Sequence, residues 1–345
     1  MWQHKILVVT DTWHPQVNGV VRSLEALATA ALDLGASVQF LTPQGFRSFR
    51  MPTYPEIRLA VTTATSVGRR IEALSVSHVH IATEGPLGFA ARRYCLKKNL
   101  CFTTSYHTKF PEYVSARAFI PKWWVYRFLR RFHNAGSGIF VSTGSLAIDL
   151  EAHGFKRLMR WSRGVDHERF RMRSTSVLDF PRPIFLSVGR LAVEKNLEAF
   201  LRLDLPGTKV VVGDGPARTA LESAYPQAYF LGTQTGDALA EIYSSADVFV
   251  FPSMTDTFGL VLLEAMSSGL PVAAFPVPGP LDVIGESGAG VLDEDLRRAC
   301  LKALGIPGWK ARIHAETFSW RASAQQFLIN LSAVDPTLSL EFMHT

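Results

Sequence analysis

Two acidic residues, Asp256 and Glu264, follow one predicted strand and are candidates for binding a ligand at its end. The apolar run 248–251 predicts a buried strand, and a helix is predicted to begin near Gly259. A helix N-terminus attracts anions, and glycine lets a ligand approach the backbone closely. Asp256 lies just before this helix, where its carboxylate can accept hydrogen bonds from sugar hydroxyls. Glu264 lies inside the helix among apolar residues, so it is either exposed or held by a partner. The plainer alternative is a helix cap at Asp256 and a surface position for Glu264.

Two cations follow another predicted strand, at residues 184–188. Arg190 and Lys195 flank the loop that comes after Gly189. Cations beside a glycine at a strand end suit a diphosphate group, although two solvated loop charges would give the same pattern.

The first half of the chain offers a glycine loop and a histidine at predicted strand ends. Asn18-Gly19 follows the strand predicted at 5–9 and resembles a nucleotide-phosphate turn, and His107 follows the strand predicted at 102–105. His107 can point into a cleft, or it can be a structural histidine. No GxGxxG or P-loop motif occurs, and Gly213-Asp214-Gly215 lacks a third glycine at the required offset, which argues against a dinucleotide site.

The sequence predicts no metal site. His78 and His80 share one face of a short strand, but no third ligand lies at a useful spacing. The acidic run 293–295 precedes a predicted helix and is interpreted as its N-terminal cap. His133 is expected on a helix surface.

The elements that position these residues repeat as strand and helix along the chain. The pattern resets near residue 165, where a polar, basic stretch begins. Repeated βα units predict an α/β fold of two Rossmann-like domains with parallel sheets, and ligands bind at the carboxyl ends of such strands. We expect a first domain at 1–165, a second at 166–319 and a C-terminal helix at 320–345 that packs back towards the first. The site is expected in a central cleft that the two sheets face.

The composition is that of a folded globular protein of two-domain length. The chain has 345 residues, of which 47% are apolar and 19% charged. It contains no apolar run long enough to span a membrane, and its start lacks a signal-peptide pattern, so we expect a cytoplasmic protein. Its three cysteines are expected to be reduced thiols.

Charge is unevenly divided between the two halves. Residues 1–165 hold 21 Lys and Arg against 9 Asp and Glu, or +12, whereas residues 166–345 hold 15 against 21, or −6. A basic half indicates an anionic partner. The segment 121–132 adds aromatics to this charge, with Trp124, Phe128 and Phe132 on one helical stripe, which favours an interfacial helix on the anionic inner face of a membrane. Core packing of the aromatics is the alternative, and nucleic acid is not expected because no nucleic-acid motif accompanies them. The predicted membrane residues are Lys122, Trp123, Trp124, Arg127, Phe128, Arg130 and Arg131.

These motifs together resemble glycosyltransferase family 4, whose members have the GT-B fold. The resemblance rests on segments 10–21, 104–108, 163–166, 189–195 and 256–264, which span nearly the whole chain in the expected order. Bacterial α-mannosyltransferases and glycosyl- or sulfoquinovosyl-diacylglycerol synthases form the subgroup that the chain resembles most.

The resemblance implies a role for each site residue. Arg190 and Lys195 would bind the donor diphosphate. The backbone of Gly19, which belongs to the other domain, would contact the same phosphate. The family's EX7E signature falls on Asp256 and Glu264, with aspartate where glutamate is usual. Asp256 would contact the transferred sugar and Glu264 the ribose hydroxyls. His107 would contact the sugar in the catalytic cleft, and backbone N–H groups at Gly259 and Leu260 would orient sugar and phosphate.

The implied activity is that of a retaining, metal-independent hexosyltransferase. It would move a hexose or hexuronic acid from a nucleotide sugar, UDP-linked rather than GDP-linked, to a lipid acceptor, with diacylglycerol first. No cofactor is expected. A polysaccharide or soluble acceptor is the nearest alternative. An NAD-dependent oxidoreductase and a non-catalytic protein that binds anionic surfaces are alternatives from other classes. Arg163, at the domain junction, would either pair with an acidic donor sugar or pin the linker.

Overall fold

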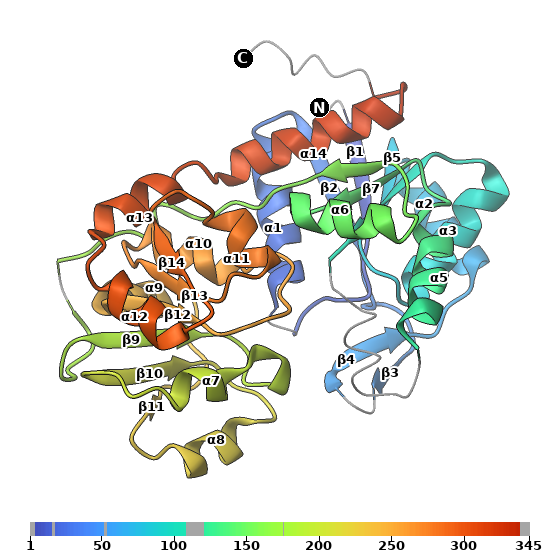
Figure 1. The fold of residues 1–345 in the computed structure, drawn as a ribbon. Helices are drawn as coiled ribbons and strands as arrows, with labels where there is room; N and C mark the ends of the chain where they lie inside the picture. Colours follow the sequence, from blue (N-terminus) through green and yellow to red (C-terminus); the bar gives the residue numbers. More distant parts are fainter. Residues whose placement is uncertain (1–3, 16–17, 52–53, 108–120, 175, 339–345) are drawn as a thin grey trace. The chain divides into compact units, whose positions relative to one another are not determined.

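The computed structural model describes residues 4–15, 18–51, 54–107, 121–174 and 176–338. The chain divides into two compact units, coloured along the sequence in Figure 1. Unit 1 comprises Met1–Arg163 together with Trp320–Thr345, and unit 2 comprises Gly164–Ser319. The boundary lies beside the reset expected near residue 165, and the last helix belongs to unit 1.

Unit 1 is built on a six-stranded parallel sheet with the strand order β2-β1-β5-β6-β7-β8. Its strands are β1 (His4–Val9), β2 (Ala36–Leu41), β5 (His78–Ile81), β6 (Phe102–Tyr106), β7 (Gly138–Val141) and β8 (Leu158–Arg160). A separate antiparallel hairpin is formed by β3 (Ser48–Met51) and β4 (Tyr54–Ala60). The helices are α1 (Gly19–Leu32), α2 (Ala64–Leu74), α3 (Pro86–Lys98), α5 (Lys122–His133), α6 (Gly144–Ala152) and α14 (Trp320–Val334).

Both faces of this sheet are buried, as alternation along β1 shows. Ile6 and Val8 face one core, which also contains Phe327 of α14. Leu7 and Val9 face the opposite core, which α2 and α3 cover. A strand with apolar residues on both faces reads as a continuous apolar run, which is why β1 was recognisable from sequence.

Unit 2 repeats the architecture with the strand order β11-β10-β9-β12-β13-β14, all parallel. Its strands are β9 (Ile184–Val188), β10 (Thr208–Val212), β11 (Tyr229–Phe230), β12 (Val248–Phe251), β13 (Val272–Ala274) and β14 (Gly290–Leu292). Its helices are η1 (Val193–Lys195), α7 (Leu197–Leu201), α8 (Arg218–Ala224), α9 (Gly236–Ser245), α10 (Leu260–Ser267), α11 (Pro278–Val283), α12 (Leu296–Ala303) and α13 (Gly308–Ala315). The predicted α/β class with two parallel sheets is confirmed.

Two expectations about local structure had opposite outcomes. The capping prediction at 293–295 is confirmed, because Asp295 accepts a hydrogen bond from the Arg298 N–H at 3.1 Å at the start of α12. The surface position predicted for His133 is wrong. The ring is fully buried and is hydrogen-bonded to Thr104 Oγ1 and Glu84 Oε1, each at 2.9 Å. Leu129 and Phe132 are also buried, so this end of α5 packs against the core.

No helix among the described residues combines the length and apolar character that crossing a membrane requires.

Candidate functional site

The topology of unit 2 brings the two predicted donor loops together. Strand order reverses between β9 and β12, which are neighbours in the sheet although β10 and β11 lie between them in the sequence. Ligands in open α/β sheets bind at such a switch point, at the carboxyl ends of the strands. The loop after β9 carries Arg190 and Lys195, and the loop after β12 carries Asp256. The two loops are joined by a hydrogen bond from the Asn196 side chain to Pro252 O at 3.1 Å.

Lys195 and Asp256 form an ion pair across these loops. Lys195 Nζ lies 2.5 Å from Asp256 Oδ1, and the two side chains are 28% and 18% exposed. Asp256 Oδ2 is buried and has no hydrogen-bond partner among the described residues. A buried acceptor of this kind costs free energy until a donor group reaches it. The second carboxylate oxygen is therefore suited to a ligand hydroxyl.

The loop that carries Arg190 is held by the glycine segment after β10. Leu191 N donates to Asp214 O, and Ala217 N donates to Leu191 O, each at 2.9 Å. A Cβ on Gly213 would lie 1.9 Å from Gly189 O, so only glycine fits there. Gly213-Asp214-Gly215 thus supports the Arg190 loop. This supporting role is not apparent in the sequence, where the segment differs from a dinucleotide site only by its missing third glycine.

The N-terminus of α10 faces the same end of the sheet. Gly259 precedes the helix in the left-handed region, with φ of 85°, and no side chain among the described residues caps the helix. A side chain at this position would be strained, which explains the glycine. The first N–H groups, including that of Leu260, are positioned to bind an anion.

Glu264 lies in α10 and is only 3% exposed. The Tyr243 hydroxyl, from α9, donates to its Oε2 at 3.1 Å. The surface position considered for Glu264 is therefore wrong, and its carboxylate is held in the protein interior. Tyr243 is a partner that sequence analysis missed, because its separation of 21 residues from Glu264 gives no pattern.

In unit 1, the Gly19 loop follows β1 at the switch point between β1 and β5. Asn18 Oδ1 caps α1 by accepting from Val20 N and Val21 N, at 3.0 and 3.1 Å, and Gly19 itself is exposed. Asp11, a buried residue of the same loop, caps α3 by accepting from Leu87 N at 2.8 Å. Burial raises the pKa of Asp11 above its usual value. These capping side chains anchor Asp11 to α3 and Asn18 to α1 on either side of the loop.

His107 follows β6 and contacts Arg163. Arg163 Nη2 donates to His107 Nδ1 at 3.2 Å, and the guanidinium lies 4.0 Å from the centre of the Trp161 ring. Burial, and then the Arg163 charge, hold the pKa of His107 well below its usual range. Because Nδ1 accepts, the neutral ring carries its proton on Nε2. Arg163 Nη1 also donates to Trp161 O at 2.8 Å, and burial lowers the Arg163 pKa to about 9.

The outer face of α5 combines exposed aromatics with cations. Trp123, Trp124 and Phe128 are 62%, 58% and 54% exposed, and Lys122, Arg127 and Arg131 are exposed beside them. We call these six residues the α5 face. Two residues depart from the predicted pattern. Phe132, on the predicted stripe, is buried, because it lies on the core side of the helix. Arg130 is half-buried and donates to His153 O at 3.1 Å, which orients it into the fold.

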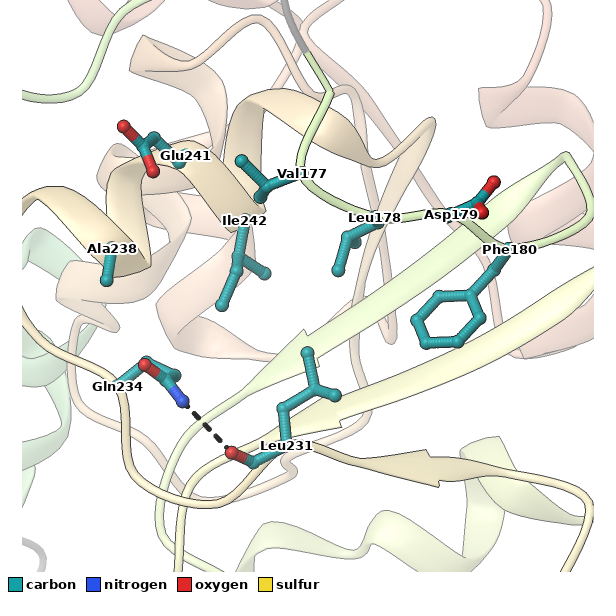
Figure 2. Close-up of a pocket in the computed structure, with 9 residues that line it drawn as sticks. All are labelled: Val177, Leu178, Asp179, Phe180, Leu231, Gln234, Ala238, Glu241 and Ile242. Carbon is teal, nitrogen blue, oxygen red and sulfur yellow. Dashed lines mark hydrogen bonds between the residues drawn. The ribbon is translucent and has the colours of Figure 1, made fainter.

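A separate cavity of about 470 Å³ lies in unit 2, as Figure 2 shows. Leu178, Leu231 and Ile242 line it with apolar side chains, and Asp179 and Glu241 add carboxylates. It includes none of the predicted site residues. Of the motif residues quoted above, Gln16, Val17 and Thr108 lie outside the described part of the chain.

Comparison with known families gives two matches along the chain. The model described as "Glycosyltransferase Family 4" matches residues 17–169, and the model "Glycosyl transferases group 1" matches residues 182–305. The two matched segments fall largely in unit 1 and unit 2, respectively.

Several known proteins are similar over most of the chain. Sulfoquinovosyl transferase SQD2 of Arabidopsis thaliana is 33% identical over 81% of this chain, which spans only 61% of that relative. A GDP-mannose-dependent alpha-mannosyltransferase of Mycobacterium tuberculosis is 32% identical over 84% of this chain and 83% of the relative. Alpha-monoglucosyldiacylglycerol synthase of Streptococcus pneumoniae is 25% identical over 87% and 78%. A solved structure of Anabaena HepE with UDP and glucose has a TM-score of 0.72 at 14% identity, covering 96% of this chain and all of that one.

Proposed function

Because this chain belongs to glycosyltransferase family 4, whose enzymes use nucleotide sugars, we propose that it transfers a hexose or hexuronic acid to a lipid acceptor. The proposed donor is a UDP-sugar rather than a GDP-sugar, and the proposed acceptor is diacylglycerol. The transfer retains the anomeric configuration and requires neither a cofactor nor a metal ion.

The observation that carries the proposal is the Lys195–Asp256 pair beside the N-terminus of α10. Cleavage of the anomeric bond leaves negative charge on the nucleoside diphosphate. Lys195, Arg190 and the helix N-terminus stabilise that charge as it develops. In enzymes generally, preorganised electrostatic stabilisation of this kind is usually the largest single contribution to catalysis. The Gly19 backbone binds the phosphate from unit 1.

The sugar and the ribose have separate proposed partners. Asp256 accepts a hydrogen bond from a sugar hydroxyl at Oδ2. Backbone N–H groups at Gly259 and Leu260 orient the sugar and phosphate. His107 donates to the sugar from Nε2. Glu264 accepts from the ribose hydroxyls. The leaving phosphate oxygen takes the acceptor proton on the same face, so no side chain is assigned as a covalent nucleophile.

The lipid acceptor is supported by the α5 face and by one relative. Exposed aromatics with interspersed cations bind the interface of an anionic membrane. The relative named alpha-monoglucosyldiacylglycerol synthase indicates that such an acceptor occurs among proteins similar to this one. We therefore propose peripheral attachment to the inner face of the membrane. The bonds from Arg163 Nη1 to Trp161 O and Ser162 O favour the linker role of Arg163 over binding of a donor carboxylate.

A transfer assay tests the proposal. The protein is incubated with vesicles that contain diacylglycerol and with labelled UDP-glucose, UDP-glucuronate, UDP-galactose or GDP-mannose. Each reaction is run with and without chelator, at a temperature at which the protein stays folded. Transfer of sugar from a UDP-sugar to diacylglycerol in the presence of chelator is expected, with an α-linked product. Glu264→Gln is expected to raise the donor KM.

Each part of the proposal has its own contrary outcome. Transfer only from GDP-mannose overturns the donor assignment, and a β-linked product overturns retention. Transfer to a soluble saccharide but never to lipid favours the alternative acceptor class. No sugar-nucleotide binding at all overturns the proposed donor site.

A further inference from the structure

Three side chains of types that can bind metals meet at the amino ends of the unit 1 strands. The candidate site residues His107 and Gly19 follow the carboxyl ends of such strands. His78 begins β5, Cys101 precedes β6, and Asp335 follows α14. One ligand atom from each lies within 4.8 Å of the others. His78 and Asp335 are buried, and Cys101 is half-buried. We propose that these residues bind a divalent transition metal ion, with zinc preferred.

His78 and Asp335 each have a partner at the atom that would not bind the ion. His78 Nε2 is 3.0 Å from Thr103 Oγ1, which leaves Nδ1 for the metal. Thr337 donates to Asp335 Oδ1 from its hydroxyl at 2.6 Å and from its N–H at 3.2 Å, which leaves Oδ2. Such outer partners orient metal ligands and fix the histidine tautomer.

Cys101 has an outer partner of the same kind. Its Sγ lies 3.1 Å from Ser137 Oγ, whose hydroxyl can donate to a thiolate. Without a metal, the thiol donates to Val334 O at 3.4 Å. On binding, the thiol releases its proton to solvent and the sulfur becomes a thiolate ligand. The proton that His78 Nδ1 now donates to Asp335 Oδ2 also leaves Nδ1, and the neutral ring then carries its proton on Nε2, beside Thr103 Oγ1.

The ligand set selects the type of ion. One imidazole, one thiolate and one carboxylate suit zinc, and their two negative charges balance its two positive charges. His78 Nδ1 and Asp335 Oδ2 are now 2.8 Å apart. Tetrahedral zinc holds its nitrogen and oxygen ligands roughly 3.3 Å apart, so these atoms must separate by about half an ångström. Water takes the fourth position, on the half-exposed Cys101 side.

His80 is not a ligand, although it shares a strand face with His78. Its Nδ1 and Nε2 are each 2.8 Å from a hydroxyl, those of Thr103 and Ser105. The two ligands that complete the site with His78 come from other segments, since Cys101 is 23 and Asp335 is 257 residues away. The bound metal therefore joins the end of α14 to the sheet, and its role is to stabilise unit 1.

Cobalt substitution tests the site directly. The reduced, chelator-treated protein is titrated with Co²⁺ and its absorption spectrum recorded. We expect one equivalent to produce a thiolate-to-cobalt charge-transfer band and intense ligand-field bands typical of a tetrahedral site, both removed by Zn²⁺. Cys101→Ser is expected to abolish the charge-transfer band and to weaken binding at least tenfold. Cys300→Ala, which removes a buried thiol of unit 2, is expected to leave the spectrum unchanged.

A second variant and a thermal measurement separate metal binding from misfolding. Asp335→Asn keeps the size of the side chain and is expected to weaken cobalt binding while the circular dichroism spectrum stays that of the parent. Zn²⁺ is expected to raise the melting temperature of the parent but not of Cys101→Ser. A parent protein that gives only the weak spectrum of octahedral cobalt, or a charge-transfer band that survives Cys101→Ser, overturns the proposal.

Discussion

At the scale of single residues, the ion pair between Lys195 and Asp256 is the feature on which the proposed donor site rests. The pair holds a cation at the strand end, and a buried carboxylate oxygen lies beside it. A ligand with a diphosphate next to a hydroxyl-bearing sugar satisfies both groups. The pair therefore explains why a positively charged and a negatively charged side chain occur together in one small site.

Lys195→Ala is expected to lower kcat/KM for the donor by about 10- to 100-fold. The reason is that a hydrogen bond to a charged group contributes about 1.5–3 kcal/mol. Steady-state kinetics with the preferred sugar nucleotide measures the effect, and Lys302→Ala, an exposed lysine of the same unit, is the matched control. Equal kinetics for the two variants would contradict the diphosphate role.

His107 is expected to lower the free energy of unfolding of the protein at acid pH. Its folded-state pKa lies well below the ordinary value near 6.5, so the unfolded state binds more protons between the two pKa values. Stability is therefore lost as the pH falls from about 6.5 towards the folded-state pKa, by at most about 1.4 kcal/mol per pH unit from this residue.

Urea unfolding at pH 6.5 and pH 5.5 measures that loss. His107→Gln cannot titrate and is expected to lose less stability over this interval than the parent. His14→Gln, at an exposed histidine, is expected to behave as the parent does. The same acid loss in parent and His107→Gln would show that the ring is not the group responsible.

At the scale of elements, α5 presents a buried face and an exposed face around its axis. Tyr126, Leu129 and Phe132 pack into the core of unit 1, and the α5 face is exposed on the other side. Helical spacing placed Phe132 on one stripe with Trp124 and Phe128, and only the structure separates the buried Phe132 from these exposed aromatics. A membrane test must therefore change residues on the exposed face alone.

Trp124→Asp combined with Arg127→Glu is expected to reduce flotation with anionic vesicles at least tenfold. The pair of changes removes an interfacial aromatic and reverses one charge, without disturbing the Arg130 bond to His153 O. Trp309→Asp, at a tryptophan of unit 2 that is 54% exposed, is the control and should leave flotation unchanged. Equal flotation on neutral vesicles would contradict the electrostatic part of the proposal.

At the scale of the whole molecule, the chain leaves unit 1 after Arg163 and returns to it at Trp320. The returning helix, α14, contributes Phe327, Leu328 and Leu331 to a core that also contains Trp161. Unit 1 is therefore incomplete until the last segment of the chain has been added. Unit 2, by contrast, is a continuous insertion with its own cores.

Phe327→Ala is expected to destabilise unit 1 by about 3–5 kcal/mol, because it removes a fully buried aromatic ring. Calorimetry should show the transition of unit 1 shifted to lower temperature and that of unit 2 nearly unchanged. Phe249→Ala, at a fully buried ring of unit 2, is the reciprocal variant and should shift the other transition. A shift of both transitions by either change would mean that the units unfold together.

The sequence by itself was sufficient to predict the α/β class and the reset near residue 165, and its motifs were sufficient for the resemblance to the family. The class and the reset depend on local patterns, namely apolar runs, helix starts and glycines at strand ends, which neighbouring residues specify. The tertiary structure decided which distant side chains meet. Tyr243 beside Glu264, Arg163 on His107, and Asp335 with Cys101 beside His78 have no periodicity that a sequence displays. Strand order and the return of α14 create these contacts, because a parallel sheet places strands side by side that are far apart in the chain.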